Sequence, residues 1–155
     1  MATDINPLNT VVELITSNYA SQDGITPTVA KIYTQPTNKS PKPNEDFILL
    51  YSINTSHASV GMGANNRSEV IEAIKIDIRS KPASTRQSLM VDDSHARKVR
   101  AEVMRIIYDN IVNPSSDFDN FDPIIRVDDL SNGNRAIFRY VITINLVDLC
   151  RDMTV

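Results

Sequence analysis

The chain of 155 residues contains no tryptophan, one cysteine and two histidines. The single cysteine, Cys150, excludes a framework of internal disulfide bonds. No apolar run approaches the roughly 18 to 20 residues that span a bilayer, and residues 1–4 lack the basic and apolar regions of a signal peptide. We therefore expect a soluble protein that is made in the cytoplasm and has no membrane partner.

The chain also lacks a large excess of charge of one sign, because 16 basic residues against 19 acidic ones give a net charge of −3. This balance provides no general attraction for nucleic acid. A local basic stripe is conceivable on one expected helix, at Arg97, Lys98, Arg100 and Arg105. Acidic residues alternate with that stripe, at Asp93, Glu102 and Asp109. A salt-bridged outer face is the favoured interpretation, and a small nucleic-acid-binding α+β module is the alternative.

Residues typical of active sites are few and are not grouped by the sequence. His57 lies in a polar stretch, and His95 lies in the first turn of an expected helix, where a solvated or capping role is the simplest interpretation. Nothing in the sequence places a histidine near Cys150, so a structural thiol is favoured over a nucleophile. We predict that the protein is not an enzyme.

Metal and phosphate motifs are incomplete. In the acidic run between Asp117 and Asp122, Phe121 and Asp122 stand where an EF-hand loop needs a ligand and a glycine. Gly61 and Gly63 lack the third glycine of a dinucleotide-binding turn. We predict no metal ion and no cofactor.

Apolar residues make up 41% of the chain and charged residues 23%, which is the composition of one globular domain over residues 1–155. Asn6 and Pro7 are typical of a helix start, and apolar residues at helical spacing predict a helix that ends near Gly24. A second helix is expected after residues 92–94, with an apolar stripe that Asn113 and Pro114 end.

Strands are expected at residues 29–34, 46–53 and 70–79, followed by a closing hairpin over residues 124–148. With the two helices, this order predicts an α+β domain whose mostly antiparallel β-sheet is packed on one face by two α-helices. Polar composition, prolines and glycines predict long flexible loops at about residues 35–45, 55–67 and 80–92.

The closing hairpin is the most specific local signal. Asn132 and Gly133 are typical of a tight primed turn, which would fix the register of the two strands. One face of the last strand is predicted to enter the core, with Phe138, Tyr140, Ile142, Ile144 and Leu146. The opposite face carries Ile137, Arg139, Val141, Thr143, Asn145 and Val147. This second face is too apolar for water alone, so we expect either another subunit or a further layer of the same chain to cover it.

Four segments together resemble the tail terminator, or tail completion, proteins of tailed viruses of bacteria and archaea. They are the helix at residues 7–19, the strand at 72–78, the helix at 94–112, and the strand at 135–145 with its Arg-Tyr-hydrophobic pattern. The resemblance covers most of the chain and includes no catalytic motif.

The resemblance implies a structural virion protein, assembled in the host cytoplasm, that forms a ring with further copies of itself, commonly a hexamer. Such a ring caps the tail tube protein and joins it to the head–tail connector protein. The six outer residues of the last strand would contact neighbouring subunits. The loops would contact the tube or connector through His57, Val60, Met62, Asn65, Arg67, Arg86, Leu89 and Met90. Another neck component of similar size is the alternative in the same class.

Overall fold

The computed structural model describes residues 7–32, 41–60, 67–81, 93–112, 120–121, 126–131 and 137–150, with the backbone alone at 55–60, 67–70, 120 and 148–150. Two helices and six strands lie in these ranges. In chain order they are α1 (Pro7–Asn18), β1 (Thr28–Lys31), β2 (Glu45–Val60), β3 (Arg67–Lys81), α2 (Ser94–Asp109), β4 (Asn120–Phe121), β5 (Arg126–Asp129) and β6 (Phe138–Cys150).

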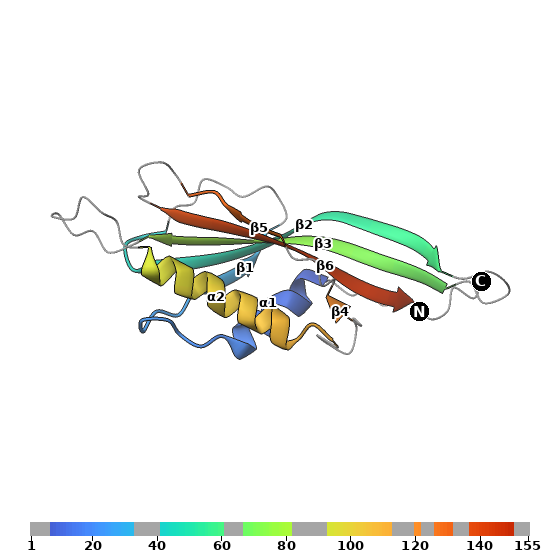
Figure 1. Cartoon of the computed structure of the whole chain (residues 1–155), viewed down its shortest axis with the longest axis horizontal. Coiled ribbons are helices and arrows are strands. Elements are labelled where there is room, and N and C mark those ends of the chain that lie inside the picture. Colours follow the sequence, from blue (N-terminus) through green and yellow to red (C-terminus); the bar gives the residue numbers. More distant parts are fainter. Residues whose placement is uncertain are drawn as a thin grey trace.

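One sheet contains all six strands, in the order β1-β2-β3-β6-β4, with β5 also paired to β6. Only β1 runs parallel to its neighbour, and every other pair is antiparallel. Both helices lie on the same face of the sheet (Figure 1). The α+β fold with two helices on one face of a mostly antiparallel sheet is confirmed.

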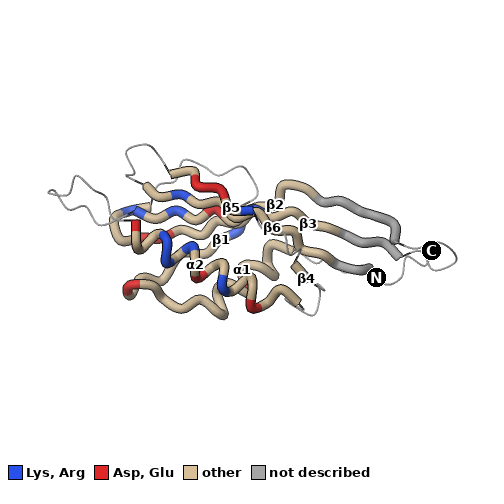
Figure 2. The backbone as a smooth tube through the Cα atoms, viewed as in Figure 1, with Lys and Arg blue, Asp and Glu red and all other residues tan. Residues whose placement is uncertain are grey.

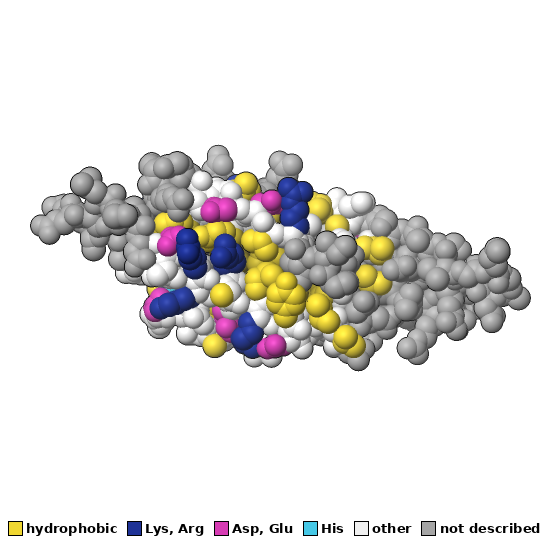
Figure 3. All heavy atoms as spheres, in the orientation of Figure 1, with side chains coloured by type: hydrophobic (Ala, Val, Ile, Leu, Met, Phe, Trp, Pro, Cys, Tyr) yellow, Lys and Arg dark blue, Asp and Glu magenta, His cyan; other side chains and the backbone are white. Residues whose placement is uncertain are grey.

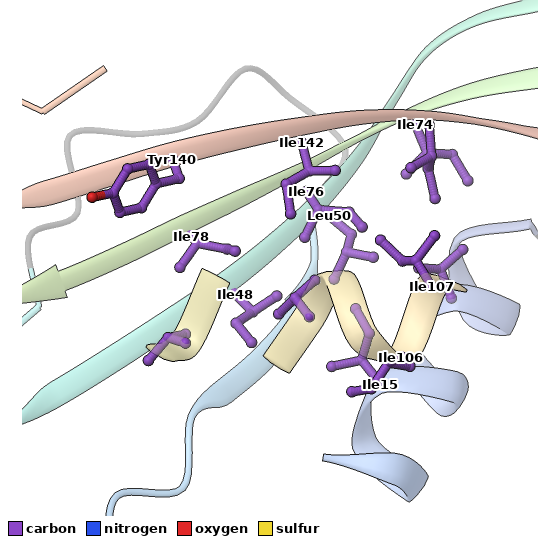
Figure 4. Close-up of a cluster of buried hydrophobic side chains, with 14 of the residues drawn as sticks. Ile15, Ile48, Leu50, Ile74, Ile76, Ile78, Ile106, Ile107, Tyr140 and Ile142 are labelled. Atoms are coloured by element: carbon purple, nitrogen blue, oxygen red, sulfur yellow. The ribbon is translucent and has the colours of Figure 1, made fainter. Parts of the chain in front are cut away.

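The core lies between that sheet face and the helices. Ile74, Ile76 and Ile78 alternate along β3 with polar residues, and all three are fully buried. They face Ile15 of α1 and Ile106 of α2 (Figure 4). The predicted core face of β6 is confirmed, because Phe138, Tyr140, Ile142, Ile144 and Leu146 are all at most 2% exposed. Each such side chain contributes about 1.5 to 3 kcal/mol through burial.

The first helix is shorter than the sequence predicts, since α1 ends at Asn18 and not near Gly24. A tight turn follows it, in which the N–H of Ile25 donates to the carbonyl of Gln22 at 2.9 Å. Asp23 and Gly24 occupy its centre with φ of 51° and 75°. Two consecutive positive φ values define a primed turn, and the Asp-Gly pair is typical of it. The second helix begins as predicted, with Asp93 at its N-cap position, but it ends at Asp109, before the predicted stop at Asn113 and Pro114.

The prediction of a flexible loop at residues 55–67 is wrong for residues 55–60 and 67, and residues 61–66 lie outside the described residues. Thr55–Val60 continue β2, and Arg67 begins β3; their backbones pair in register from Thr55↔Glu72 to Val60↔Arg67. Their own composition does not favour order, but a strand can form where its backbone pairs with a neighbouring strand. His57, Val60 and Arg67 are therefore strand residues.

The other two expected loops have shifted boundaries. Glu45 already belongs to β2, and Ser80 and Lys81 still belong to β3. Ser80 is buried because its hydroxyl bonds to a carboxylate of β2, which holds the strand end in place. The remaining parts, residues 35–40 and 82–92, lie outside the described residues.

The hairpin between β5 and β6 exists, but its register differs from the prediction. A two-residue turn at Asn132 and Gly133 would pair Asp129 with Ala136. Asp129 pairs with Tyr140 instead, and the N–H of Leu130 donates to the carbonyl of Arg139 at 2.8 Å. The turn residues themselves lie outside the described residues. Register in this sheet follows the buried alternation of β6, which a slip of one residue would reverse.

Three of the strands, β2, β3 and β6, are much longer than the helices. At about 3.3 Å per residue, the 16 residues of β2 span about 53 Å, whereas the 16 residues of α2 span about 24 Å. As a result, β2, β3 and β6 continue past the helices as a three-stranded arm (Figure 1). We use the name arm for residues 54–60 of β2, 67–73 of β3 and 145–150 of β6. Neither described helix is long and apolar enough to cross a membrane.

Substitution of Gly24 tests the explanation of the turn after α1. A Cβ at this residue would meet nothing within 4 Å, so the glycine is required for its φ of +75° alone. Gly24→Val should lower the free energy of unfolding by about 1 to 2 kcal/mol, because a β-branched residue is strained there. Gly24→Asn is the matched control and should cost less, since asparagine tolerates this region. Urea unfolding of both variants measures the difference; equal losses would contradict the explanation.

Candidate functional site

Polar side chains gather in three clusters, two on the helix side of the sheet and one on its outer face. The first, the His95 cluster, joins α2 to the strands. His95 Nε2 lies 2.8 Å from Asp46 Oδ2 of β2, and His95 Nδ1 lies 2.7 Å from Asp23 Oδ2 in the turn. Ser80 Oγ donates to Asp46 Oδ1 at 2.7 Å, and Lys98 Nζ donates to Asp23 Oδ1 at 2.9 Å.

The protonation state of His95 follows from these contacts. Only an imidazolium donates from both ring nitrogens, and two carboxylates face it. Partial burial lowers the pKa of His95, but hydrogen bonds to Asp23 and Asp46 outweigh it, so the pKa is raised above its ordinary value. Hydrogen bonds from Lys98 and His95 lower the pKa of Asp23. The sequence did not reveal this cluster, because the partners of His95 lie 49 and 72 residues away.

The His95 cluster holds segments together and does not resemble a hydrolase triad. In a triad the histidine lies between the hydroxyl and the carboxylate. Here the Ser80 hydroxyl donates to Asp46, and the carboxylate lies between Ser80 and His95. The imidazole therefore has no contact through which it would activate Ser80.

The second cluster ties the end of α1 to α2. Arg105 binds Glu102 Oε1 at 2.6 Å, Asp109 Oδ2 at 2.8 Å and the carbonyl of Asn18 at 2.9 Å. Glu102 Oε1 also accepts the N–H of Ala20 at 2.9 Å. Hydrogen bonding from Arg105 lowers the pKa of Glu102. These contacts explain why Glu102 is buried, at 8% exposed, on an otherwise apolar helix face.

Between these two clusters lies the hydroxyl of Tyr19. It is buried and has no hydrogen-bond partner among the described residues. Burial raises the pKa of Tyr19, and the charges of Asp46 and Glu102 raise it further. The phenol therefore stays neutral and packs against the core.

The third cluster lies on the outer face of the sheet, which the helices do not cover. Asp77 of β3 is completely buried and accepts hydrogen bonds from Arg79 at 3.1 Å and from Arg139 of β6 at 2.8 Å. Burial raises the pKa of nearby Tyr51, and the charge of Asp77 adds to this. We call these four residues the Asp77 cluster. The two arginines compensate an otherwise costly buried carboxylate.

Five of the six predicted subunit-interface residues lie on this outer face of β6, and Ile137 directly precedes the strand, but the six are not equally accessible. Val141 and Val147 are 2% and 8% exposed within the single chain. The others, Ile137, Arg139, Thr143 and Asn145, are partly exposed. The chain itself therefore covers Val141 and Val147. The exposed part of the face is the strip around Thr143, which includes Arg139 and Asn145.

The predicted partner-contact residues divide between the arm and undescribed segments. The backbones of His57, Val60 and Arg67 lie at the far end of the arm. The others, Met62, Asn65, Arg86, Leu89 and Met90, lie outside the described residues. The predicted contacts of these residues with a partner therefore stay a prediction.

The four basic residues of α2 all have partners within the chain. Arg97 binds Asp93 at 2.7 Å, Lys98 binds Asp23, and Arg105 binds two carboxylates. Arg100 lies over the ring of Tyr140, 4.7 Å from its centroid. Basic and acidic residues are interspersed along this helix (Figure 2). These contacts favour the salt-bridged interpretation over a basic stripe for nucleic acid.

The helix side of the molecule also has an apolar surface. Tyr108 in the last turn of α2 is 54% exposed, and Val112 after the helix is 68% exposed. Apolar side chains gather over the middle of this face (Figure 3). Among the described residues, no group of three or more histidines, cysteines or carboxylates is placed to hold a metal ion.

Comparison with known proteins adds no relative. No protein-family model matches the chain, and no curated protein matches it in sequence. Its function is therefore inferred from the geometry.

The His95 cluster predicts a pH dependence of stability. Because the folded pKa of His95 is raised above its unfolded value near 6.5, its stabilisation is complete below that value and is lost as the pH rises through the folded pKa. His95→Gln should remove this alkaline loss and cost on the order of 1 kcal/mol at pH 6. Chemical unfolding of both proteins between pH 6 and pH 9 measures this, at values chosen around the histidine range.

Asn110→Gln is the control, since the side-chain amide of Asn110 donates to the carbonyl of Ile106 and carries no titrating proton. It should keep the wild-type pH profile. A wild-type profile that is flat across the histidine range, or one that His95→Gln leaves unchanged, would contradict the charged state assigned to His95.

Proposed function

We propose that this protein is a structural subunit of the neck of a tailed virus, where copies form a ring that caps the tail tube and joins it to the head-side connector. The observation that carries the proposal is the arm. Beyond the short pairing of β4 with Leu146 and Val147, it is a single layer of three strands that continues past both helices (Figure 1).

A single-layer ribbon of this kind lacks the second layer that normally buries a sheet face. Three strands need packing on a hydrophobic face for independent stability. Leu146, at the base of the arm, is buried with the core, and beyond it neither described helix continues beside the arm (Figure 1). Subunits of an assembly have such a face covered by a partner. Here a neighbouring subunit of the ring, or the tail tube, would cover it.

The charge distribution supports an assembly role over nucleic-acid binding. On α2, Arg97, Lys98 and Arg105 are paired with carboxylates and Arg100 lies over Tyr140, so this helix offers little unpaired positive charge to displace counterions from phosphates. The exposed outer strip around Thr143 has the mixed polar and apolar character of a subunit contact. A different neck component of similar size would have the same features.

The proposed ring is tested by native mass spectrometry and negative-stain microscopy, alone and with isolated tail tubes. We expect a closed ring with a central hole, formed either alone or on the tube end. Copies that stay unassembled in both conditions would contradict the proposed function.

Thr143→Glu tests the surface that joins the subunits. The neighbours of Thr143 across the strands are Lys75 and Arg126, so a glutamate meets positive charge and the folded subunit is preserved. In a contact between subunits the same carboxylate is desolvated, and we expect at least about a tenfold loss of ring formation.

Ala101→Glu is the matched control on the helix side. Ala101 is exposed on α2 and has Arg97 and Arg105 one turn away on either side, so it accepts a glutamate equally well. Rings should form normally with this variant. Rings that form normally with Thr143→Glu would move the subunit contact away from the outer face.

A further inference from the structure

The outer edge of β2 has no strand beside it along the arm. β1 pairs only with residues 47–50 of β2, and from Tyr51 to Val60 no described strand lies on that side. An unpaired edge presents a row of backbone N–H and C=O groups that accept another strand. The sequence of this edge, residues 51–60, contains no charged residue and no proline. Natural sheets commonly protect an edge with such residues, and this one does not.

The direction of these backbone groups follows from the register. The N–H of Ile32 donates to the carbonyl of Leu50, so the backbone of Leu50 points towards β1 and that of Tyr51 points towards β3. Tyr51 pairs with Lys75, and β3 continues without irregularity, so Ala73, Ile71 and Glu69 also point towards β2.

The partners of those β3 residues determine which groups of the arm point outward. They are Asn54, Ser56 and Ala58, and their backbones are therefore used within the sheet. The alternate residues, Thr55, His57 and Ser59, turn their N–H and C=O groups to the outer edge. Three successive outward residues are enough for a short antiparallel ladder.

We propose that this edge binds the same edge of a second copy of the chain, antiparallel, as a two-fold dimer. An antiparallel strand pair about a two-fold axis is self-complementary, so the Thr55, His57 and Ser59 groups of one copy face those of the other. The neutral sequence avoids repulsion between like charges on the two strands. The arm also projects beyond the helices, so two arms meet without a clash between α-helical layers (Figure 1).

The opposite edge of the sheet is a poorer partner for a head-to-tail contact. There β6 is already paired with β4 at residues 146–147 and with β5 at 140–143. The outer strand β5 has only four residues, and Arg126, Asp128 and Asp129 give it charge. The longest neutral edge that a second copy offers is therefore its own residues 51–60.

The size of the contact indicates its strength. About ten residues from each copy is below the twenty to thirty a side of a standard stable interface, so we expect a dissociation constant on the order of 10 μM. A two-fold contact closes on itself and does not repeat around a ring. The dimer is thus distinct from the proposed ring contact and does not rest on the proposed function.

His57→Pro tests the dimer through the backbone. Proline removes the outward N–H, which bonds to nothing in the described sheet, and is tolerated at an edge. Sedimentation equilibrium over a concentration series that brackets the expected constant should show dimers for the wild type and at least tenfold weaker association for His57→Pro. His57→Ala keeps the N–H and should dimerise like the wild type.

Hydrogen exchange on the wild type gives a second measurement that needs no variant. The amides of Thr55, His57 and Ser59 should exchange more slowly at concentrations where the dimer forms, while the amide of Ala101 on α2 should not change. A wild type that stays monomeric at every concentration, or that dimerises without protecting these amides, would overturn the proposal. So would ring-sized species that His57→Pro abolishes, because the edge would then belong to the ring contact.

Discussion

The pairing of β3 with two neighbours at once is the constraint on which the rest of the structure depends. β3 is paired with β2 on one side and with β6 on the other along almost its whole length. Because side chains alternate along a strand, this double pairing sends Ile74, Ile76 and Ile78 to the helices. It sends Asp77 and Arg79 to the opposite face, beside Arg139 of β6.

The two faces of β3 stabilise the fold in different ways. The isoleucine face supplies hydrophobic burial, which does not depend strongly on direction. The Asp77 cluster contributes little net stability, since desolvation of the buried ions offsets much of their attraction. Its contacts do depend on register: a slip of β6 by one residue would carry Arg139 to the core and leave Asp77 with one arginine fewer. Burial therefore stabilises the sheet, and the ion pairs disfavour its nearest alternative alignment.

Periodicity in the sequence predicted the helices and strands whose buried side chains recur at a regular spacing along the chain. The core face of β6, the alternation of β3 and the apolar stripe of α2 are of this kind. Thr55–Val60 were predicted as loop because their own side chains give no strand signal, and the partner strand that orders them begins at Arg67. His95 was predicted as a solvated or capping residue, yet it is bound between two carboxylates. These failures share one cause, which is that contacts between distant segments override local preference.

A single irregularity separates the body of the sheet from the arm. The register between β2 and β3 shifts between Ser52 and Asn54, so Ile53 is an extra residue, and it is 49% exposed. A bulge bends its strand and increases the local twist, so this residue sets the direction in which the arm leaves the helices. It also exchanges the roles of odd and even positions along β2: Leu50 turns its backbone outward before the bulge, and Thr55, His57 and Ser59 do so after it. The extra residue at Ile53 therefore determines both where the arm points and which of its backbone groups a partner can reach.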